Sequence, residues 1–122
     1  MKLKNSLYNI INSEPTAKGV RFDIQLNPEH TIYKAHFPGQ PITPGVCIVQ
    51  IAVELLEEHL NAALQLKTAK NVKFLSVISP CENKGISYEL QNSSEEDGLG
   101  KWQTVVTSSQ NNFAKLSLVC QK

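Results

Sequence analysis

The stretch HFPGQPITPG, residues 36–45, constrains this chain most, because it places three prolines and two glycines beside one histidine. Proline fixes φ and glycine permits close backbone approach, so we predict a loop that is held in one shape. Thr43 is expected to be the N-cap of a following helix and Pro44 its first residue. The backbone N–H of Gly45 would then be unpaired at the helix start, where it can bind an oxygen that carries negative charge.

A histidine beside such an amide suits one kind of chemistry. A neutral imidazole at His36 could remove a proton next to a carbonyl, while the Gly45 amide stabilises the enolate that results. Burial would favour the neutral ring near pH 7. His30, in contrast, lies in a polar turn, where we expect it to be solvated or to cap a helix. The loop is therefore the predicted site.

Residues 45–60 have the pattern of a helix that is apolar on nearly all sides. Between Val46 and Leu56 the strongly polar side chains are Gln50 and Glu54. Such a helix belongs inside a protein, and a rise of ~1.5 Å per residue makes it about 24 Å long. Gln50 and Glu54 are four residues apart and share one face, as part of a solvated stripe or of a site. A solvated face is expected for Glu57, Glu58 and His59.

Strands are predicted on both sides of this helix. Residues 20–26 alternate between apolar and polar side chains, which indicates a strand with one buried face. Residues 6–13 are either a strand or a short helix, ended by a turn at 14–19. The second half is expected to form three or four antiparallel strands, with a bulge or a shared face near Lys115 where the alternation is irregular. The predicted strands are residues 71–79, 85–91, 101–109 and 112–120.

Length and charge exclude several classes of protein. A chain of 122 residues with 41% hydrophobic content predicts one α+β domain over residues 1–122. Its 12 basic and 11 acidic residues leave a net charge of +1, which argues against nucleic acid binding. We expect no signal peptide, no membrane span and no metal site. Cys47, Cys81 and Cys120 form no C-x-x-C pair, which indicates reduced thiols in a cytoplasmic protein. Cys47 is expected to be a buried small hydrophobe.

The loop, together with the apolar residues 46–49, resembles the signature of the hotdog-fold 3-hydroxyacyl-acyl carrier protein dehydratases of fatty acid synthesis. The motif covers a small part of the chain, while the length and element order are similar to the family from end to end. The resemblance implies a hotdog fold, in which an antiparallel sheet wraps around one long central helix. It also implies a syn elimination of water from a 3-hydroxyacyl thioester, which gives the trans-2-enoyl thioester.

Carried over by position, the resemblance implies a role for each site residue. His36 would be the base at C2, with its other ring nitrogen held by the Ile42 carbonyl, and the Gly45 amide would polarise the thioester carbonyl. Gln50 stands where the family has an acid, and Glu54 stands where it often has Gln. Our hypothesis is that Glu54 assists departure of the 3-hydroxyl while Gln50 orients it; the competing interpretation is that the acid is missing. The residues expected to bind substrate are Phe37, Pro38, Gly39, Ile42 and Val46.

The resemblance also implies partners. The substrate would be carried on the phosphopantetheine of acyl carrier protein or of CoA, with no other cofactor. Two chains would form a homodimer, or a hetero-oligomer with a related dehydratase, with sheets joined edge to edge and sites shared between subunits. The alternative functions are an impaired subunit that binds acyl thioesters and a hotdog thioesterase. The basic residues common in the family are lacking at 74–82, but other lysines could form a rim for an acidic carrier: Lys34, Lys67, Lys70 and Lys73.

Overall fold

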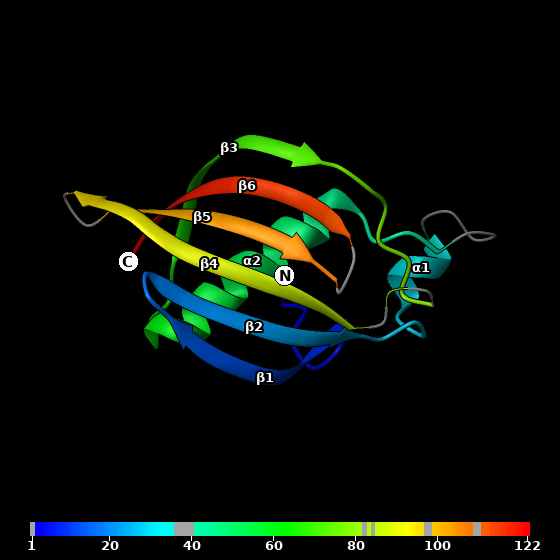
Figure 1. Ribbon diagram of the computed structural model, residues 1–122. Helices are drawn as coiled ribbons and strands as arrows, with labels where there is room; N and C mark the ends of the chain where they lie inside the picture. Colours follow the sequence, from blue (N-terminus) through cyan, green and yellow to red (C-terminus); the bar gives the residue numbers. More distant parts are fainter. Residues whose placement is uncertain (1, 36–40, 82, 84, 97–98, 109–110) are drawn as a thin grey trace.

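The computed structural model describes residues 2–35, 41–81, 83, 85–96, 99–108 and 111–122. Six strands form one antiparallel sheet in the order β1-β2-β4-β5-β6-β3, and this sheet curves around the long helix α2 (Figure 1). The arrangement is an α+β hotdog fold, as predicted. The elements are β1 (Tyr8–Thr16), β2 (Gly19–Leu26), α1 (Thr31–Ala35), α2 (Gly45–Leu60), β3 (Gln65–Phe74), β4 (Gly85–Glu96), β5 (Leu99–Thr107) and β6 (Asn112–Gln121).

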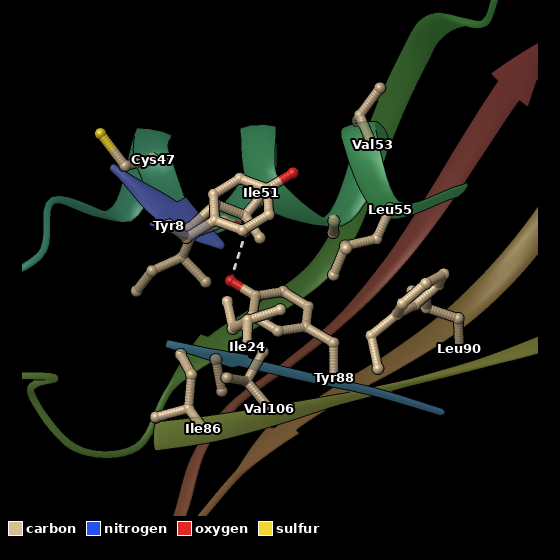
Figure 2. Close-up of a cluster of buried hydrophobic side chains, with 14 of the residues drawn as sticks. Tyr8, Ile24, Cys47, Ile51, Val53, Leu55, Ile86, Tyr88, Leu90 and Val106 are labelled. Atoms are coloured by element: carbon tan, nitrogen blue, oxygen red, sulfur yellow. Dashed lines mark hydrogen bonds between the residues drawn. The ribbon is translucent and has the colours of Figure 1, made fainter. Parts of the chain in front are cut away.

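Helix α2 is enclosed by the sheet because it carries apolar side chains on several of its faces. Ile51 and Leu55 are fully buried, and they lie among sheet residues such as Leu90 (Figure 2). A buried hydrogen bond also ties sheet to helix, since the Tyr88 hydroxyl donates to the carbonyl of Ile48 at 2.9 Å. Burial raises the pKa of Tyr88 well above its ordinary value, so this donor keeps its proton. Burying each large apolar side chain contributes about 1.5–3 kcal/mol, so the helix is held mainly by its core contacts.

The third strand differs from the prediction. It covers residues 65–74 instead of 71–79, and it pairs with β6 instead of β4. The meander therefore has three strands, and β3 forms one edge of the sheet. Most side chains of β3 are exposed, so this segment lacks the clear alternation of apolar and polar residues that predicts a half-buried strand. The predicted bulge does occur, on the β3 side: the register shifts between Lys70 and Lys73, opposite Lys115.

Smaller differences lie near the first strands. Strand β1 continues through Glu14 and Pro15, where we predicted a turn, because an edge strand tolerates proline. Residues 31–35 form the short helix α1, which the sequence pattern did not indicate. The expected capping role of His30 is confirmed, since its Nδ1 accepts a hydrogen bond from the backbone N–H of Ile32 at 3.0 Å.

Three further properties bear on function. Cys47, Cys81 and Cys120 are free thiols, and Cys47 is buried as predicted. In the part of the chain that the structure describes, no helix is long and apolar enough to cross a membrane. The same residues contain no cluster of three or more side chains that could hold a metal ion.

Candidate active site

The predicted loop is described only at its two ends. His36, Phe37, Pro38 and Gly39 lie outside the described residues, and so does the expected contact of the histidine ring with Ile42. Helix α1 leads into the loop, and residues 41–44 connect it to α2 (Figure 1). The structure therefore shows the frame that positions the loop.

Buried hydrogen bonds hold that frame together. The hydroxyls of Tyr33 on α1 and Thr43 lie 2.9 Å apart, and both residues are almost fully buried. The backbone N–H of Thr43 donates to the carbonyl of Ile78 at 2.8 Å. Burial raises the pKa of Tyr33, while its bond to Thr43 acts in the opposite direction. The two ends of the loop are thus tied to each other and to the segment that follows β3.

The start of α2 differs in one detail from the prediction. Pro44 is the N-cap and, as a proline, makes no side-chain capping bond, while the Thr43 hydroxyl is paired with Tyr33. The first helical hydrogen bonds are donated by Cys47 and Ile48, both to the Pro44 carbonyl. The backbone N–H of Gly45 therefore precedes the helical hydrogen bonds, as expected for a group that can bind a developing negative charge.

Gly45 is also a position of close approach. A Cβ there would lie 2.8 Å from Cζ of Phe74, whose half-exposed ring covers the helix start. Val46, a predicted substrate-binding residue, is 66% exposed beside it, and Ile42 is partly buried. The Cys47 thiol points inward, and burial raises its pKa, so it is not a reactive thiolate. The helix start therefore presents backbone amides on an apolar surface.

Gln50 and Glu54 touch each other, which confirms that they share one face of α2. The Gln50 Nε2 donates to Glu54 Oε2 at 2.8 Å. Because an ionised carboxylate only accepts hydrogen bonds, the amide group that faces it must be the NH₂ group. The amide oxygen of Gln50 is consequently directed away from Glu54.

Glu54 is 5% exposed and has three more donors. The backbone N–H of Leu3 lies 2.8 Å from Oε2, that of Lys4 lies 2.8 Å from Oε1, and the Tyr8 hydroxyl lies 3.1 Å from Oε1. With Gln50 these make four donors, and a carboxylate offers about four lone-pair sites. Burial, and then the charge of Glu54, raise the pKa of Tyr8, so its hydroxyl remains a donor. Glu54 thus fastens the N-terminal segment to α2.

Three residues of this region were missed as site residues by the sequence interpretation. Tyr8 and Tyr33 gave no local signal, because their hydroxyls meet partners that the fold brings to them. Phe74 gave no signal of this contact either, because its position beside Gly45 depends on the path of β3. The catalytic roles assigned to His36 and Glu54 remain predictions.

The sequence is similar to known dehydratases. A sequence model of the ApeI-like dehydratases matches residues 12–115. Two relatives are the 3-hydroxyacyl-[acyl-carrier-protein] dehydratases FabZ of Ligilactobacillus salivarius and Latilactobacillus sakei. The first is 29% identical over 86 residues, which is 65% of this chain but only 60% of that protein. The second is 23% identical over 120 residues, or 92% of this chain and 84% of that protein.

Solved structures show the same fold. The dehydratase heterocomplex ApeI:P from Xenorhabdus doucetiae contains a chain with a TM-score of 0.73 and 17% identity, over 93% of this chain and 97% of that one. A mutant thioesterase from Pseudomonas aeruginosa has a TM-score of 0.65 and 8% identity, over 88% and 76%. These identities support the fold alone. Because the family model matches most of the sequence, this chain belongs to the ApeI-like dehydratase family.

Proposed function

We propose that this protein eliminates water from a 3-hydroxyacyl thioester to give the trans-2-enoyl thioester. Family membership supports a dehydratase, and the frame of the loop supports the location of the site. The observation that carries the proposal is the pair of bonds at Thr43, which holds both ends of the His36 loop beside the start of α2. Acyl carrier protein is the proposed carrier of the substrate, with CoA as the alternative, and exposed lysines such as Lys34 and Lys73 are available to an acidic carrier.

Each proposed step uses one group of this chain. His36 takes the proton from C2, and the Gly45 amide stabilises the negative charge that develops on the thioester oxygen. Gln50 orients the 3-hydroxyl with its amide oxygen. The departing hydroxyl needs a proton, which Gln50 cannot supply at neutral pH. Either Glu54 supplies it, or the imidazolium of His36 returns the proton taken from C2, since a syn elimination places both groups on one face. The four hydrogen bonds to Glu54 favour the second route.

We propose that the site is completed by a second chain. Strand β3 is an edge of the sheet, and large apolar side chains are exposed at its end and just beyond it, at Phe74, Leu75 and Val77. A copy that pairs along this edge would cover them and would enclose the apolar surface at the helix start. The ApeI:P heterocomplex raises the alternative of a related dehydratase as partner.

The assembly can be tested by sedimentation. We expect a dimer at micromolar concentration, and Leu75→Lys should shift the chain toward the monomer, because it places a charge on the proposed interface. A matched control is Ile11→Lys, since Ile11 is 61% exposed on the opposite edge strand β1. A folded wild-type monomer at micromolar concentration would refute both the dimer and the shared site.

The reaction can be tested by following the absorbance of the enoyl thioester on carrier-linked and short CoA substrates. We expect His36→Ala to lower the rate about 10²- to 10⁴-fold, the usual range for a general base. His59→Ala is the matched control and should keep the rate, because His59 is exposed near the C-terminal end of α2, far from the loop. Equal rates for wild type and His36→Ala would contradict the proposal.

A second candidate is a subunit that binds acyl thioesters with little turnover. It is favoured by Gln50, which stands where the resembling family has its acid and cannot transfer a proton at neutral pH. In that case a non-reactive acyl thioester analogue would bind tightly, while the enoyl product would form only after a related dehydratase is added. Release of free thiol in the same assay would indicate thioesterase activity instead.

A further inference from the structure

A cavity of about 170 Å³ lies at the C-terminal end of α2, the end opposite the proposed active site. In Figure 1 this is the side of the molecule where the C-terminus lies, far from α1. Leu60 and Leu64 line the cavity from the helix end, and Trp102 and Cys120 line it from the sheet. None of these residues takes part in the proposed reaction, so the cavity needs a separate explanation.

Trp102 supplies an unused hydrogen-bond donor to this cavity. The residue is only 5% exposed, and its ring meets the edge of the His59 ring, with the centroids 6.0 Å apart. Its indole N–H makes no hydrogen bond to the described residues. An indole N–H that opens on a cavity can donate a hydrogen bond to water or to a ligand there.

Gly100 keeps the space beside that donor open. A Cβ at Gly100 would lie 3.1 Å from Nε1 of Trp102, and both residues line the cavity. The same Cβ would lie 3.6 Å from Trp102 Cδ1. The glycine thus leaves room for a ligand atom against the N–H.

The lining carries no net charge. It includes one acidic and one basic side chain, Glu95 and Lys122, together with the amide of Asn92. Burial raises the pKa of the Cys120 thiol to about 11, so this group is also neutral near pH 7. The lining offers no excess of opposite charge to an ion, so nothing would offset the unfavourable desolvation of that ion.

We propose that this cavity binds a small, uncharged, apolar molecule that carries one hydrogen-bond acceptor, with the acceptor placed on the Trp102 indole N–H. Size supports the assignment, because an apolar cavity of roughly 150 Å³ is known to hold benzene. The ligand class is therefore a ring or short chain of about six or seven heavy atoms with one ether or carbonyl oxygen.

Trp102 is the one tryptophan of the chain, so its fluorescence reports on this cavity alone. The full chain is titrated with tetrahydropyran, with cyclohexane as its isostere without an acceptor, and with cyclopentanecarboxylate as a charged ring of similar size. We expect a saturable change in fluorescence with tetrahydropyran. Binding of the other two should be at least about ten-fold weaker, because cyclohexane lacks an acceptor and cyclopentanecarboxylate carries a charge. Equal affinity for tetrahydropyran and cyclohexane would overturn the role of the indole N–H.

Gly100→Ala and Gly85→Ala form a matched pair of variants. A Cβ at Gly100 would occupy the space beside the indole nitrogen, whereas a Cβ at Gly85 would meet nothing within 4 Å. We expect Gly100→Ala to weaken tetrahydropyran binding at least about ten-fold and Gly85→Ala to leave it unchanged. If Gly100→Ala does not fold, Leu64→Phe fills the cavity from the opposite wall and should have the same effect.

Trp102→Phe gives an independent readout, because binding can then be followed by the NMR signals of the Leu60 and Leu64 methyl groups. We expect the variant to bind tetrahydropyran and cyclohexane equally weakly. No saturable change in wild-type fluorescence or methyl signals would overturn the proposal. The rate of enoyl thioester formation is measured separately, so either result leaves the test of the proposed active site intact.

Discussion

The two polar regions of α2 differ in how completely their hydrogen-bonding groups are used. Around Glu54 each oxygen of a nearly buried carboxylate accepts two hydrogen bonds. At the helix start the Gly45 amide precedes the helical hydrogen bonds, and the apolar side chains beside it, Val46 and Phe74, are exposed. One region is closed and the other is open.

The difference indicates where chemistry can occur. A carboxylate with four donors must lose a hydrogen bond before it can take up a proton, so it is poorly suited to proton transfer. A backbone amide at a helix start, outside the helical hydrogen bonds, can stabilise charge that appears only during the reaction. We therefore propose that the Glu54 region serves stability and the helix start serves the reaction, and the following predictions test that division.

The largest effect is expected from Gln50→Glu. The new carboxyl group would lie against Glu54, and two carboxylates so close share a proton, which raises the pKa of the pair. The variant would then hold a protonated acid near the 3-hydroxyl, and turnover should rise by up to about 10²- to 10⁴-fold. The measurement is the initial rate of enoyl thioester formation by the folded protein.

Glu54→Gln is the companion variant. If Glu54 only anchors the N-terminal segment, turnover per folded protein should change little. A loss of about 10²- to 10⁴-fold with the dimer intact, and no gain from Gln50→Glu, would instead support the hypothesis that Glu54 supplies the proton. The two variants together therefore separate the two proton routes.

The next effect concerns stability. Glu54→Leu would leave the backbone N–H groups of Leu3 and Lys4 and the Tyr8 hydroxyl without their acceptor. We expect the free energy of unfolding to fall by about 3–5 kcal/mol in chemical denaturation, the range for losing one partner of a buried charged network. The control is Glu58→Gln, because the exposed pair of Glu58 with Lys4 at 3.0 Å should contribute at most about 1 kcal/mol. Equal losses in the two variants would contradict the anchoring role.

The parts of this structure that depend on local patterns could be predicted from the sequence. The bounds of α2 and the contact of Gln50 with Glu54 follow from helical spacing. Strand β3 could not be placed, because a polar edge strand has a weak pattern and its pairing with β6 is a long-range choice. The hydrogen-bond partners of Glu54 could not be predicted either, since Leu3 is 51 positions away in the sequence. Likewise the sequence made Thr43 a suitable N-cap, and only the fold shows that its hydroxyl is hydrogen-bonded to the Tyr33 hydroxyl instead.

The smallest effect is expected from Tyr8→Phe, which removes one of the four donors to Glu54. One hydrogen bond to a charged group contributes about 1.5–3 kcal/mol, and the other three donors still hold the carboxylate, so a loss of stability near the lower end is expected.

The pH dependence of the stability gives the sharper test of Tyr8→Phe. The folded pKa of Tyr8 is raised, so both states are protonated below the unfolded pKa of about 10, and the stability is then fully present. Above that pH the unfolded chain releases the proton while the folded chain keeps it, so stability falls as pH rises. Tyr8→Phe should flatten this decline between pH ~9 and ~11 by up to about 1.4 kcal/mol per pH unit, measured by denaturation at each pH against wild type. An equally steep decline in the variant would show that the Tyr8 hydroxyl is not held by Glu54 in solution, and the closed region would then be smaller than we describe.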